Sequence, residues 1–243
     1  MRMELRDLCR KLRLAHVYDY ATRPDIPEEE KPAILTCLRH EQEQRELAKA
    51  NRFVKQAGFH SEKQLQNYVW HNQITFPNYL TKEDLITLEF IDKKENLIFI
   101  GTPGTGKTSL ATALGLEACK DGKQVRFYRV LDLVDKLLRA TRKGTLKRTR
   151  KSIQNCDLLI LDELGYLPLD QEGSELLFHL ISDFYERKSL IITTNLEFSA
   201  WNKVFQDPRL TSALVDRLIH HAHIFSFSGE SYRFTNALST RKN

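Results

Sequence analysis

The feature that most restricts how this chain can fold is a glycine-rich segment between a short apolar run and a helical pattern. The apolar run covers residues 97–100, the helical pattern starts at Lys107, and the segment between them fits Gly-x-x-x-x-Gly-Lys-Thr. Glycines let successive backbone N–H groups turn toward one anion, and the amino terminus of the following helix adds a favourable dipole. The sequence therefore predicts a loop that binds the phosphates of ATP, made of Gly101, Thr102, Pro103, Gly104, Thr105, Gly106, Lys107 and Thr108.

Two acidic residues follow a second apolar run. Residues 158–161 are apolar, and Asp162 and Glu163 come directly after them. Ligands of open α/β sheets bind at the carboxyl ends of the strands. We therefore expect Asp162 and Thr108 to hold Mg²⁺, and Glu163 to polarise the attacking water as a general base. Lys107 is expected to reach the β- and γ-phosphates. With this phosphate loop and Glu163 as the base, the chain is predicted to be an ATPase that forms ADP and phosphate.

Each of these assignments has a purely structural alternative. A glycine-rich turn without a ligand and an exposed acidic turn would carry the same residues, but the two motifs together favour a nucleotide site. A third apolar strand, at 189–194, is followed by Asn195. The amide of Asn195 could orient a water beside the γ-phosphate, or it could cap the next turn. The residues alone leave these two roles open.

Apolar runs and amphipathic patterns alternate from residue 96 onward. Strands are predicted at 97–100, 124–130, 158–162, 189–194 and 224–227, and helices at 107–120, 131–142, 174–187 and 210–220. Strands that alternate with crossover helices form a parallel sheet that is covered on both faces. We therefore expect an α/β nucleotide-binding domain with a five-stranded parallel sheet over residues 76–243.

The N-terminal region has a different pattern. Apolar residues at helical spacing predict a helix over 3–20, and the proline-containing segment 22–27 ends it. A strongly charged helix is expected over 28–56 and a short helix over 61–70. Residues 1–75 are therefore predicted to form a small helical domain.

Charge, cysteines and apolar stretches limit the possible partners and compartments. The formal net charge is +5, and residues 1–90 contain as many acidic as basic side chains, so the excess lies in residues 91–243. The four cysteines form no CxxC pair, which fits a reducing compartment and gives little support to a metal or redox centre. No secretory signal and no apolar stretch of about 18 residues is present. We therefore expect a cytoplasmic protein without a membrane partner.

A cluster of cations accounts for most of the excess charge. Seven lysines and arginines fall within residues 139–151, a stretch without an acidic residue that should extend the predicted helix 131–142 and the linker after it. Such cations repel one another, so an anionic partner is expected, and the phosphates of duplex DNA are the natural one. A solvated basic face is the alternative. The cations predicted to contact DNA are Arg139, Arg142, Lys143, Lys147, Arg148, Arg150 and Lys151.

Two further groups of residues suggest a site but favour a structural interpretation. His220, His221 and His223 could be metal ligands, but we expect no carboxylate or thiol partner near them and therefore no metal. Tyr68 and Trp70 could stack on adenine, but packing between the two domains is the favoured interpretation.

Five segments extend these motifs, namely Asn96-Leu-Ile-Phe-Ile-Gly-Thr-Pro-Gly-Thr-Gly-Lys-Thr108, Asp157-Leu-Leu-Ile-Leu-Asp-Glu-Leu-Gly-Tyr-Leu-Pro168, Ile192-Thr-Thr-Asn195, Leu214-Val-Asp-Arg-Leu-Ile-His-His-Ala-His223 and Gly229-Glu-Ser-Tyr-Arg233. Over about residues 40–235 the chain resembles the AAA+ ATPases. The resemblance narrows to their DnaC-like branch and to the IstB-type ATP-binding proteins of insertion sequences. It implies an AAA+ P-loop NTPase fold, and it explains the three histidines as residues at the end of a helix.

The resemblance also implies roles for individual residues. Asn195 corresponds to the sensor-1 residue, Arg217 to the arginine finger that reaches the ATP of a neighbouring subunit, and Arg233 to the sensor-2 arginine that contacts the γ-phosphate in cis. A guanidinium in these positions would stabilise charge on the transferring phosphoryl group. Arg209 is a rival for the finger, and Arg217 and Arg233 could instead have structural roles.

A trans-acting arginine implies an ATP-driven homo-oligomer. The resembled proteins are transposition helpers in which the segment corresponding to the basic run contacts DNA. The resemblance thus implies a helper that assembles on duplex target DNA and recruits or stimulates a cognate transposase. A helicase loader of the DnaC-like branch and an ATP-switched assembly scaffold are the alternatives. The block Asp-Glu-Leu-Gly-Tyr-Leu-Pro favours the helper over the loader, and Glu163 argues against a scaffold that does not hydrolyse ATP.

Overall fold

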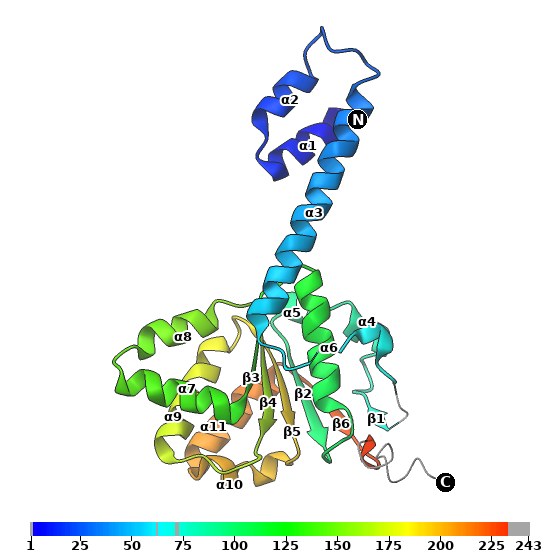
Figure 1. Ribbon diagram of the computed structural model, residues 1–243. Coiled ribbons are helices and arrows are strands. Elements are labelled where there is room, and N and C mark those ends of the chain that lie inside the picture. Colours follow the sequence, from blue (N-terminus) through cyan, green and yellow to red (C-terminus); the bar gives the residue numbers. More distant parts are fainter. Residues whose placement is uncertain (1, 62, 71–72, 233–243) are drawn as a thin grey trace, which may run out of the picture. The chain divides into compact units, whose positions relative to one another are not determined.

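Residues 2–61, 63–70 and 73–232 are described by the structure, a computed structural model (Figure 1). Contacts within the chain divide it into two compact units, residues 1–52 and 53–243. The predicted domain boundary after residue 75 lies further along the chain and stays a prediction.

The first unit is a small helical assembly with its own apolar core. It consists of α1 (Arg2–Leu12), α2 (Ala15–Ala21) and most of α3 (Lys31–Ala57). The buried leucines of α1 and α3 recur at helical spacing and form one cluster, because each helix turns a single apolar face inward. These leucines are Leu5, Leu8, Leu12, Leu35 and Leu38.

The predicted continuous helix over residues 3–20 is wrong, because the chain turns between α1 and α2. Arg13 has a φ of +58°, a left-handed conformation that ends α1. The carbonyl oxygen of Leu12, left without a partner inside the helix, accepts a hydrogen bond of 3.0 Å from Nη1 of Arg45 on α3. A contact from a distant residue therefore stabilises this helix end, and the local sequence does not reveal it.

The second unit is built around a six-stranded sheet in the order β1-β6-β2-β5-β4-β3. The strands β2, β3, β4, β5 and β6 all run parallel, which confirms the predicted sheet. Their bounds are β2 (Asn96–Gly101), β3 (Val125–Arg129), β4 (Leu158–Leu164), β5 (Ser189–Thr194) and β6 (Ala222–Phe227). The edge strand β1 (Ile74–Thr75) pairs antiparallel with β6 and was not predicted, since two residues are too few to show a pattern.

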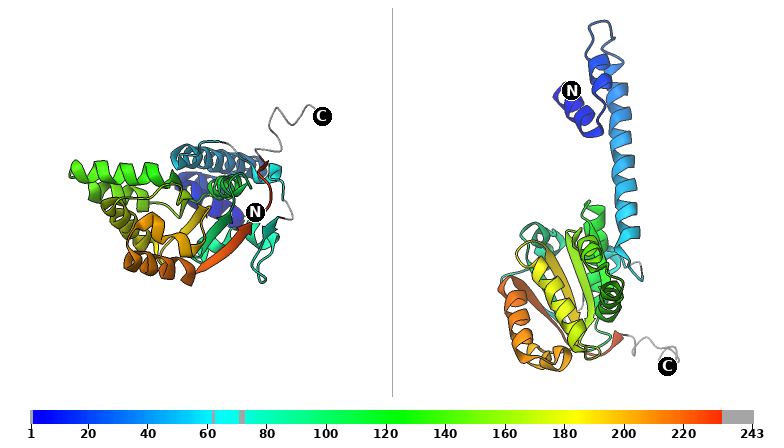
Figure 2. Two further views of the ribbon diagram at one scale, coloured as in Figure 1. Left: turned by 90° about the horizontal axis from the view of Figure 1, so that it is seen from below. Right: turned by 90° about the vertical axis from the view of Figure 1, so that its left-hand side faces the viewer.

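Helices cover both faces of the sheet (Figure 2). Successive strand residues point to opposite faces, so Leu97 and Phe99 pack with α6, whereas Ile98 and Ile100 pack with α7, α9 and α11. The longer helices are α6 (Lys107–Lys120), α7 (Val130–Arg142), α8 (Leu146–Gln154), α9 (Gln171–Phe184) and α11 (Pro208–His220). The short ones are η1 (Leu65–Asn67), α4 (Lys82–Ile86), α5 (Glu89–Asp92), η2 (Phe198–Ala200) and α10 (Asn202–Phe205).

Two segments differ from their predicted form. Residues after Gly144 were expected to be a linker, but they form α8, because Ile153 is buried in the core and Arg150 pairs with Asp183 of α9. Of the predicted helix 61–70, the residues that the structure describes form only the single turn η1. Among the described residues, no helix combines the length and the apolar character that crossing a membrane requires.

Candidate functional site

The loop between β2 and α6 has the backbone that phosphate binding requires. Gly106 is the N-cap residue of α6 and has a φ of +96°, which side chains disfavour. Gly101 ends β2, and a Cβ atom there would lie 1.9 Å from the carbonyl oxygen of Phe227. Glycine is therefore required at both positions. The loop leads directly into the amino terminus of α6, where an anion is favoured.

Lys107 is a buried cation at the start of α6. Its side chain is held against the loop, because Nζ donates hydrogen bonds of 2.6 and 2.7 Å to the carbonyl oxygens of Gly101 and Thr102. The hydroxyl of Thr105, also buried, donates to the carbonyl oxygen of Thr102 at 2.8 Å. The ammonium group therefore lies beside the backbone that the sequence assigns to phosphate.

Asp162 and Thr108, the predicted ligands of Mg²⁺, are in direct contact. Oγ1 of Thr108 donates to Oδ1 of Asp162 at 2.8 Å, and Oγ1 of Thr193 donates to the same oxygen at 2.6 Å. Asp162 is only 2% exposed, and the two hydroxyl donors offset part of the cost of burying its carboxylate. Thr193 could not be predicted from the sequence, because only the pairing of β4 with β5 brings it to Asp162.

Glu163 has an unusual backbone. Its φ is +61°, and its N–H group donates to Oγ1 of Thr193 at 3.0 Å. Its side chain is exposed, with Oε2 3.7 Å from Nε of Arg129 at the end of β3. Left-handed conformations are uncommon for residues other than glycine and tend to occur at functional sites. Asp162 is buried and Glu163 is exposed, so the two adjacent carboxylates have different surroundings.

Asn195 lies exposed immediately after β5. The turn that follows is held by Thr194, whose hydroxyl accepts a hydrogen bond of 3.1 Å from the N–H group of Leu196. The hydroxyl of Thr194 thus supplies a cap for this turn. The role of Asn195 toward a nucleotide stays a prediction.

The two candidate finger arginines lie on α11 in different surroundings. Arg217 is half-buried against α9, where Nη1 donates to Oγ of Ser182 at 3.2 Å and the guanidinium lies 5.0 Å from the ring centre of Phe178. Arg209 is exposed and borders an open depression of about 520 Å³ that Asp216 also lines. Both roles stay predictions.

The third predicted arginine, Arg233, lies outside the described residues. The described segment just before it lies against the phosphate loop. The N–H group of Tyr232 donates to the carbonyl oxygen of Gly104 at 3.0 Å, and a Cβ atom on Gly104 would meet Oγ of Ser231.

The predicted DNA-contacting cations lie on α7, on α8 and on the turn between them. Two of the seven have carboxylate partners: Arg139 pairs with Asp135 at 2.6 Å, and Arg150 pairs with Asp183. The other five are exposed and form no ion pair with any residue that the structure describes. These five, Arg142, Lys143, Lys147, Arg148 and Lys151, are called the basic surface below.

Tyr68 lies beside the phosphate loop. Its hydroxyl is buried without a hydrogen-bond partner among the described residues, and a Cβ atom on Gly106 would approach it to 3.1 Å. Burial raises the pKa of Tyr68 to about 12. A line of ring contacts leads from Tyr68 to Trp70 (5.1 Å), Phe76 (6.1 Å) and Phe225 of β6 (5.2 Å). Tyr68 and Trp70 thus pack, as favoured, but within the second unit.

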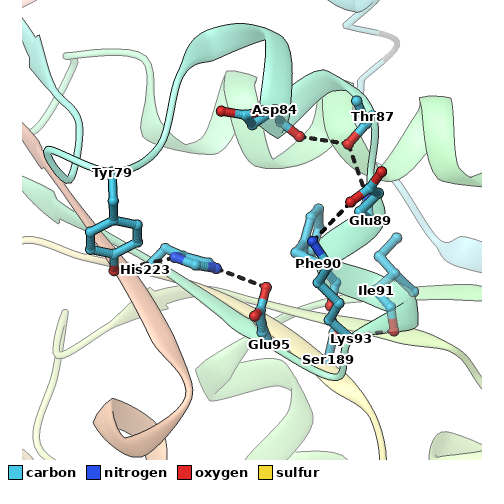
Figure 3. Close-up of polar contacts among 10 residues, drawn as sticks. All are labelled: Tyr79, Asp84, Thr87, Glu89, Phe90, Ile91, Lys93, Glu95, Ser189 and His223. Carbon is cyan, nitrogen blue, oxygen red and sulfur yellow. Dashed lines mark hydrogen bonds and ion pairs between the residues drawn. The ribbon is translucent and has the colours of Figure 1, made fainter.

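The expectation that no carboxylate lies near the three histidines is wrong. Nε2 of His223 is 2.9 Å from Oε2 of Glu95, and its Nδ1 is 3.3 Å from the hydroxyl of Tyr79 (Figure 3). Nε2 of His221 is 3.4 Å from Oε1 of Glu186. These glutamates are distant in sequence, and only the folded chain brings them to the histidines.

The fold and the site together define a class. The order β6-β2-β5-β4-β3, the phosphate loop after β2 and Asp162 on β4 are the arrangement of a P-loop ATP-binding protein of the AAA+ class. Within that class, the chain belongs to the family of IstB-like ATP binding proteins, whose family model matches residues 28–240.

Curated relatives carry names from insertion sequences. The insertion sequence IS232 putative ATP-binding protein of Bacillus thuringiensis subsp. berliner is 37% identical over 93% of this chain and 89% of the relative. The insertion sequence IS21 putative ATP-binding protein of Pseudomonas aeruginosa is 38% identical over 74% of this chain and 68% of the relative.

Solved structures of proteins named for DNA replication are similar to this chain. The DnaC helicase loader matches with a TM-score of 0.55 and 26% identity, over 68% of this chain and 97% of that one. A DNA replication initiation factor matches with a TM-score of 0.56 and 26% identity over 70% of this chain. The present chain spans half the length of that factor.

Proposed function

We propose that the chain hydrolyses ATP with Mg²⁺ and acts as a transposition helper on duplex DNA. The observation that carries the catalytic part is the junction of β2, β4 and β5. There the buried Asp162 accepts hydrogen bonds from the hydroxyls of Thr108 and Thr193, and Glu163 follows it on β4 with a left-handed backbone. A buried carboxylate that can be a metal ligand and an exposed carboxylate thus lie next to a phosphate loop, as water attack on a phosphoryl group requires.

The residues fit the nucleotide and the ion that the proposal requires. Thr108 and Asp162 offer the oxygen ligands that Mg²⁺ prefers, and Mg²⁺ would neutralise charge on the β- and γ-phosphates. Lys107 would exchange the carbonyl oxygens of its own loop for phosphate oxygens. Asn195, Arg217 and Arg233 are proposed to orient water and to stabilise transferring charge, Arg217 from a neighbouring copy.

Tyr68 is proposed to contact the nucleoside end of ATP. Asp162 lies on β4, which is separated from β2 by β5. The ring contacts of Tyr68 lead to β6, on the other side of β2. The end of ATP that faces away from Mg²⁺ would therefore approach Tyr68, and its buried hydroxyl would gain a partner there.

Replacing Glu163 with glutamine tests the catalytic proposal. We expect ATP to bind with unchanged affinity and turnover to fall by roughly 10²- to 10⁴-fold, the usual contribution of a general base. The matched control is Glu175→Gln, an exposed glutamate of α9 that should keep full turnover. ATP binding by titration and phosphate release separate the two steps. Normal turnover in Glu163→Gln would remove its role as base.

The DNA-directed part of the proposal rests on the basic surface and on the family. Exposed cations without carboxylate partners can be neutralised by DNA phosphates, which gives sequence-independent and salt-sensitive binding. Relatives are named as ATP-binding proteins of insertion sequences, so the partner that we propose is a transposase. We propose that the chain binds it as a homo-oligomer assembled on DNA, in the cytoplasm.

A helicase loader is the second candidate, because the match to the DnaC helicase loader covers 97% of that chain. The two functions predict different partners. For a helper, ATPase activity in the presence of duplex DNA should rise when the cognate transposase is added, and should not respond to the replicative helicase of the same cell. The reverse response would favour the loader.

A further inference from the structure

Two adjacent histidines at the end of α11 lie beside a glutamate that is distant in the sequence. α11 ends at His220, His221 is its C-cap residue, and Glu186 lies in the turn between α9 and β5. One ligand atom of each residue lies within 4.8 Å of those of the other two. We propose that Glu186, His220 and His221 form a binding site for a divalent transition-metal ion of the Zn²⁺ class.

The donor set selects the kind of ion. Two imidazoles and one carboxylate suit Zn²⁺ and its neighbours in the first transition row. Mg²⁺ prefers oxygen ligands, which Thr108 and Asp162 supply at the nucleotide site. Three protein ligands leave one position of a tetrahedral ion open to water or to another molecule.

A neighbouring tyrosine orients one of the ligands. The hydroxyl of Tyr185 lies 3.0 Å from Nδ1 of His220. A hydrogen bond to one ring nitrogen fixes the orientation of a histidine and leaves the other nitrogen for the metal. Nε2 is therefore the ligand atom of His220. Tyr185 is a positioning residue, because it acts through His220.

Hydrogen bonds hold the backbone of the site in place. Glu186 has a left-handed φ of +57°, and the N–H groups of Arg187 and Lys188 donate to the carbonyl oxygen of Phe184 at 2.9 and 3.0 Å, which closes the turn. The carbonyl oxygen of His221 accepts a hydrogen bond of 2.7 Å from the N–H group of Asn96. Ligands on fixed backbones bind an ion with a smaller loss of conformational freedom.

The site is separate from the nucleotide site. β5 begins at Ser189 and β6 at Ala222, directly after the ligands, so the ligands lie at the amino-terminal edge of the parallel sheet. The phosphate loop follows the carboxyl end of β2. A bound ion would fasten the end of α11, which carries Arg217 one turn earlier, to the turn after α9. The inference does not depend on ATP hydrolysis.

Zn²⁺ titration of the full chain without nucleotide tests the proposal. The background carries Cys37→Ser, because Cys37 is an exposed thiol that could bind Zn²⁺. Competition with a chromophoric chelator should show one Zn²⁺ per chain with an affinity that His220→Ala and Glu186→Gln each weaken by roughly tenfold or more. Co²⁺ should give the visible absorption of a four-coordinate ion, and His220→Ala should lose it. Tyr185→Phe should weaken Zn²⁺ binding and keep the Co²⁺ spectrum.

The matched control is His40→Ala, which removes an exposed histidine of α3 and should leave Zn²⁺ affinity unchanged. A thermal scan completes the test, since Zn²⁺ should raise the melting temperature of the background protein and of His40→Ala but not of His220→Ala. Equal Zn²⁺ affinity in the background protein and in His220→Ala would overturn the proposal. So would the lack of any binding below millimolar Zn²⁺.

Discussion

At the scale of single residues, Tyr68 offers a direct test of the nucleotide site. Its pKa of about 12 keeps the hydroxyl protonated, and therefore a donor, throughout the physiological range. A buried donor without a partner costs stability, and a ligand atom that accepts from it recovers that cost. Tyr68→Phe should therefore leave the melting temperature of the nucleotide-free protein unchanged or raise it, while the Kd for ATP rises roughly three- to tenfold.

Two comparisons make the Tyr68 measurement specific. Inorganic tripolyphosphate should bind Tyr68→Phe as well as it binds the natural chain, because the contact is with the nucleoside. Ser174 on α9 carries the other buried hydroxyl without a partner among the described residues. Ser174→Ala should share the effect on stability and leave ATP affinity unchanged. If ATP binds Tyr68→Phe as tightly as the natural chain, the hydroxyl does not face the nucleotide.

Residues of the candidate site could be predicted from the sequence where they form a contiguous motif, and not where they contact one another across the sheet. The phosphate loop and the pair Asp162 and Glu163 could be predicted, because each is a contiguous motif beside an apolar strand. Thr193 and Arg129 could not, since both reach the carboxylates across the sheet, from β5 and β3. The left-handed backbone of Glu163 has no local signal either, and its N–H group bonds to Thr193 on a neighbouring strand.

At the scale of elements, strands were easier to predict than helix ends and connections. The parallel strands are buried on both faces, so they appear in the sequence as short apolar runs. The sequence does not reveal α8, because most of its residues are polar or charged and only Leu146 and Ile153 contact the core. The break after α1 and the antiparallel pairing of β1 depend on contacts with distant residues.

The structure narrows the prediction for DNA binding to the basic surface, because Arg139 and Arg150 are paired with carboxylates and, within the described part of the chain, the five cations of that surface are not. Replacing Arg142, Lys143, Lys147, Arg148 and Lys151 with glutamine should weaken binding to duplex DNA of any sequence. The slope of log K against log salt should flatten by up to about 4 to 5, since each phosphate contact contributes about 0.9. Fluorescence anisotropy at several salt concentrations measures both quantities.

The control for the basic surface must change the net charge equally. Five exposed cations elsewhere, Arg6, Lys11, Arg13, Lys55 and Lys63, serve this purpose when they are replaced together by glutamine. This variant should keep most of the salt dependence if DNA contacts the basic surface. Equal flattening in both variants would mean that net charge alone, rather than this surface, attracts DNA.

At the scale of the whole molecule, the surroundings of Arg217 bear on how active sites are completed. Within one chain Arg217 contacts Ser182 and Phe178, and neither residue belongs to the phosphate loop or to the Asp162 junction. If its guanidinium serves a nucleotide, the proposal is that this nucleotide is bound by another copy. Hydrolysis would then depend on assembly, and the rate per subunit should rise with protein concentration and with duplex DNA.

Mixing two inactive variants tests this dependence without relying on concentration alone. Arg217→Ala keeps Glu163 but lacks the arginine, and Glu163→Gln has the opposite defect, so each alone should lose most of its turnover, with about 10³-fold or more expected for a trans-acting arginine. In a 1:1 mixture, an Arg217→Ala subunit receives the arginine of a Glu163→Gln neighbour, and turnover should return. The same mixture made with Arg209→Ala distinguishes the rival arginine. If turnover returns only in the mixture that contains Arg209→Ala, the finger is Arg209. If turnover returns in neither mixture, each subunit completes its own site.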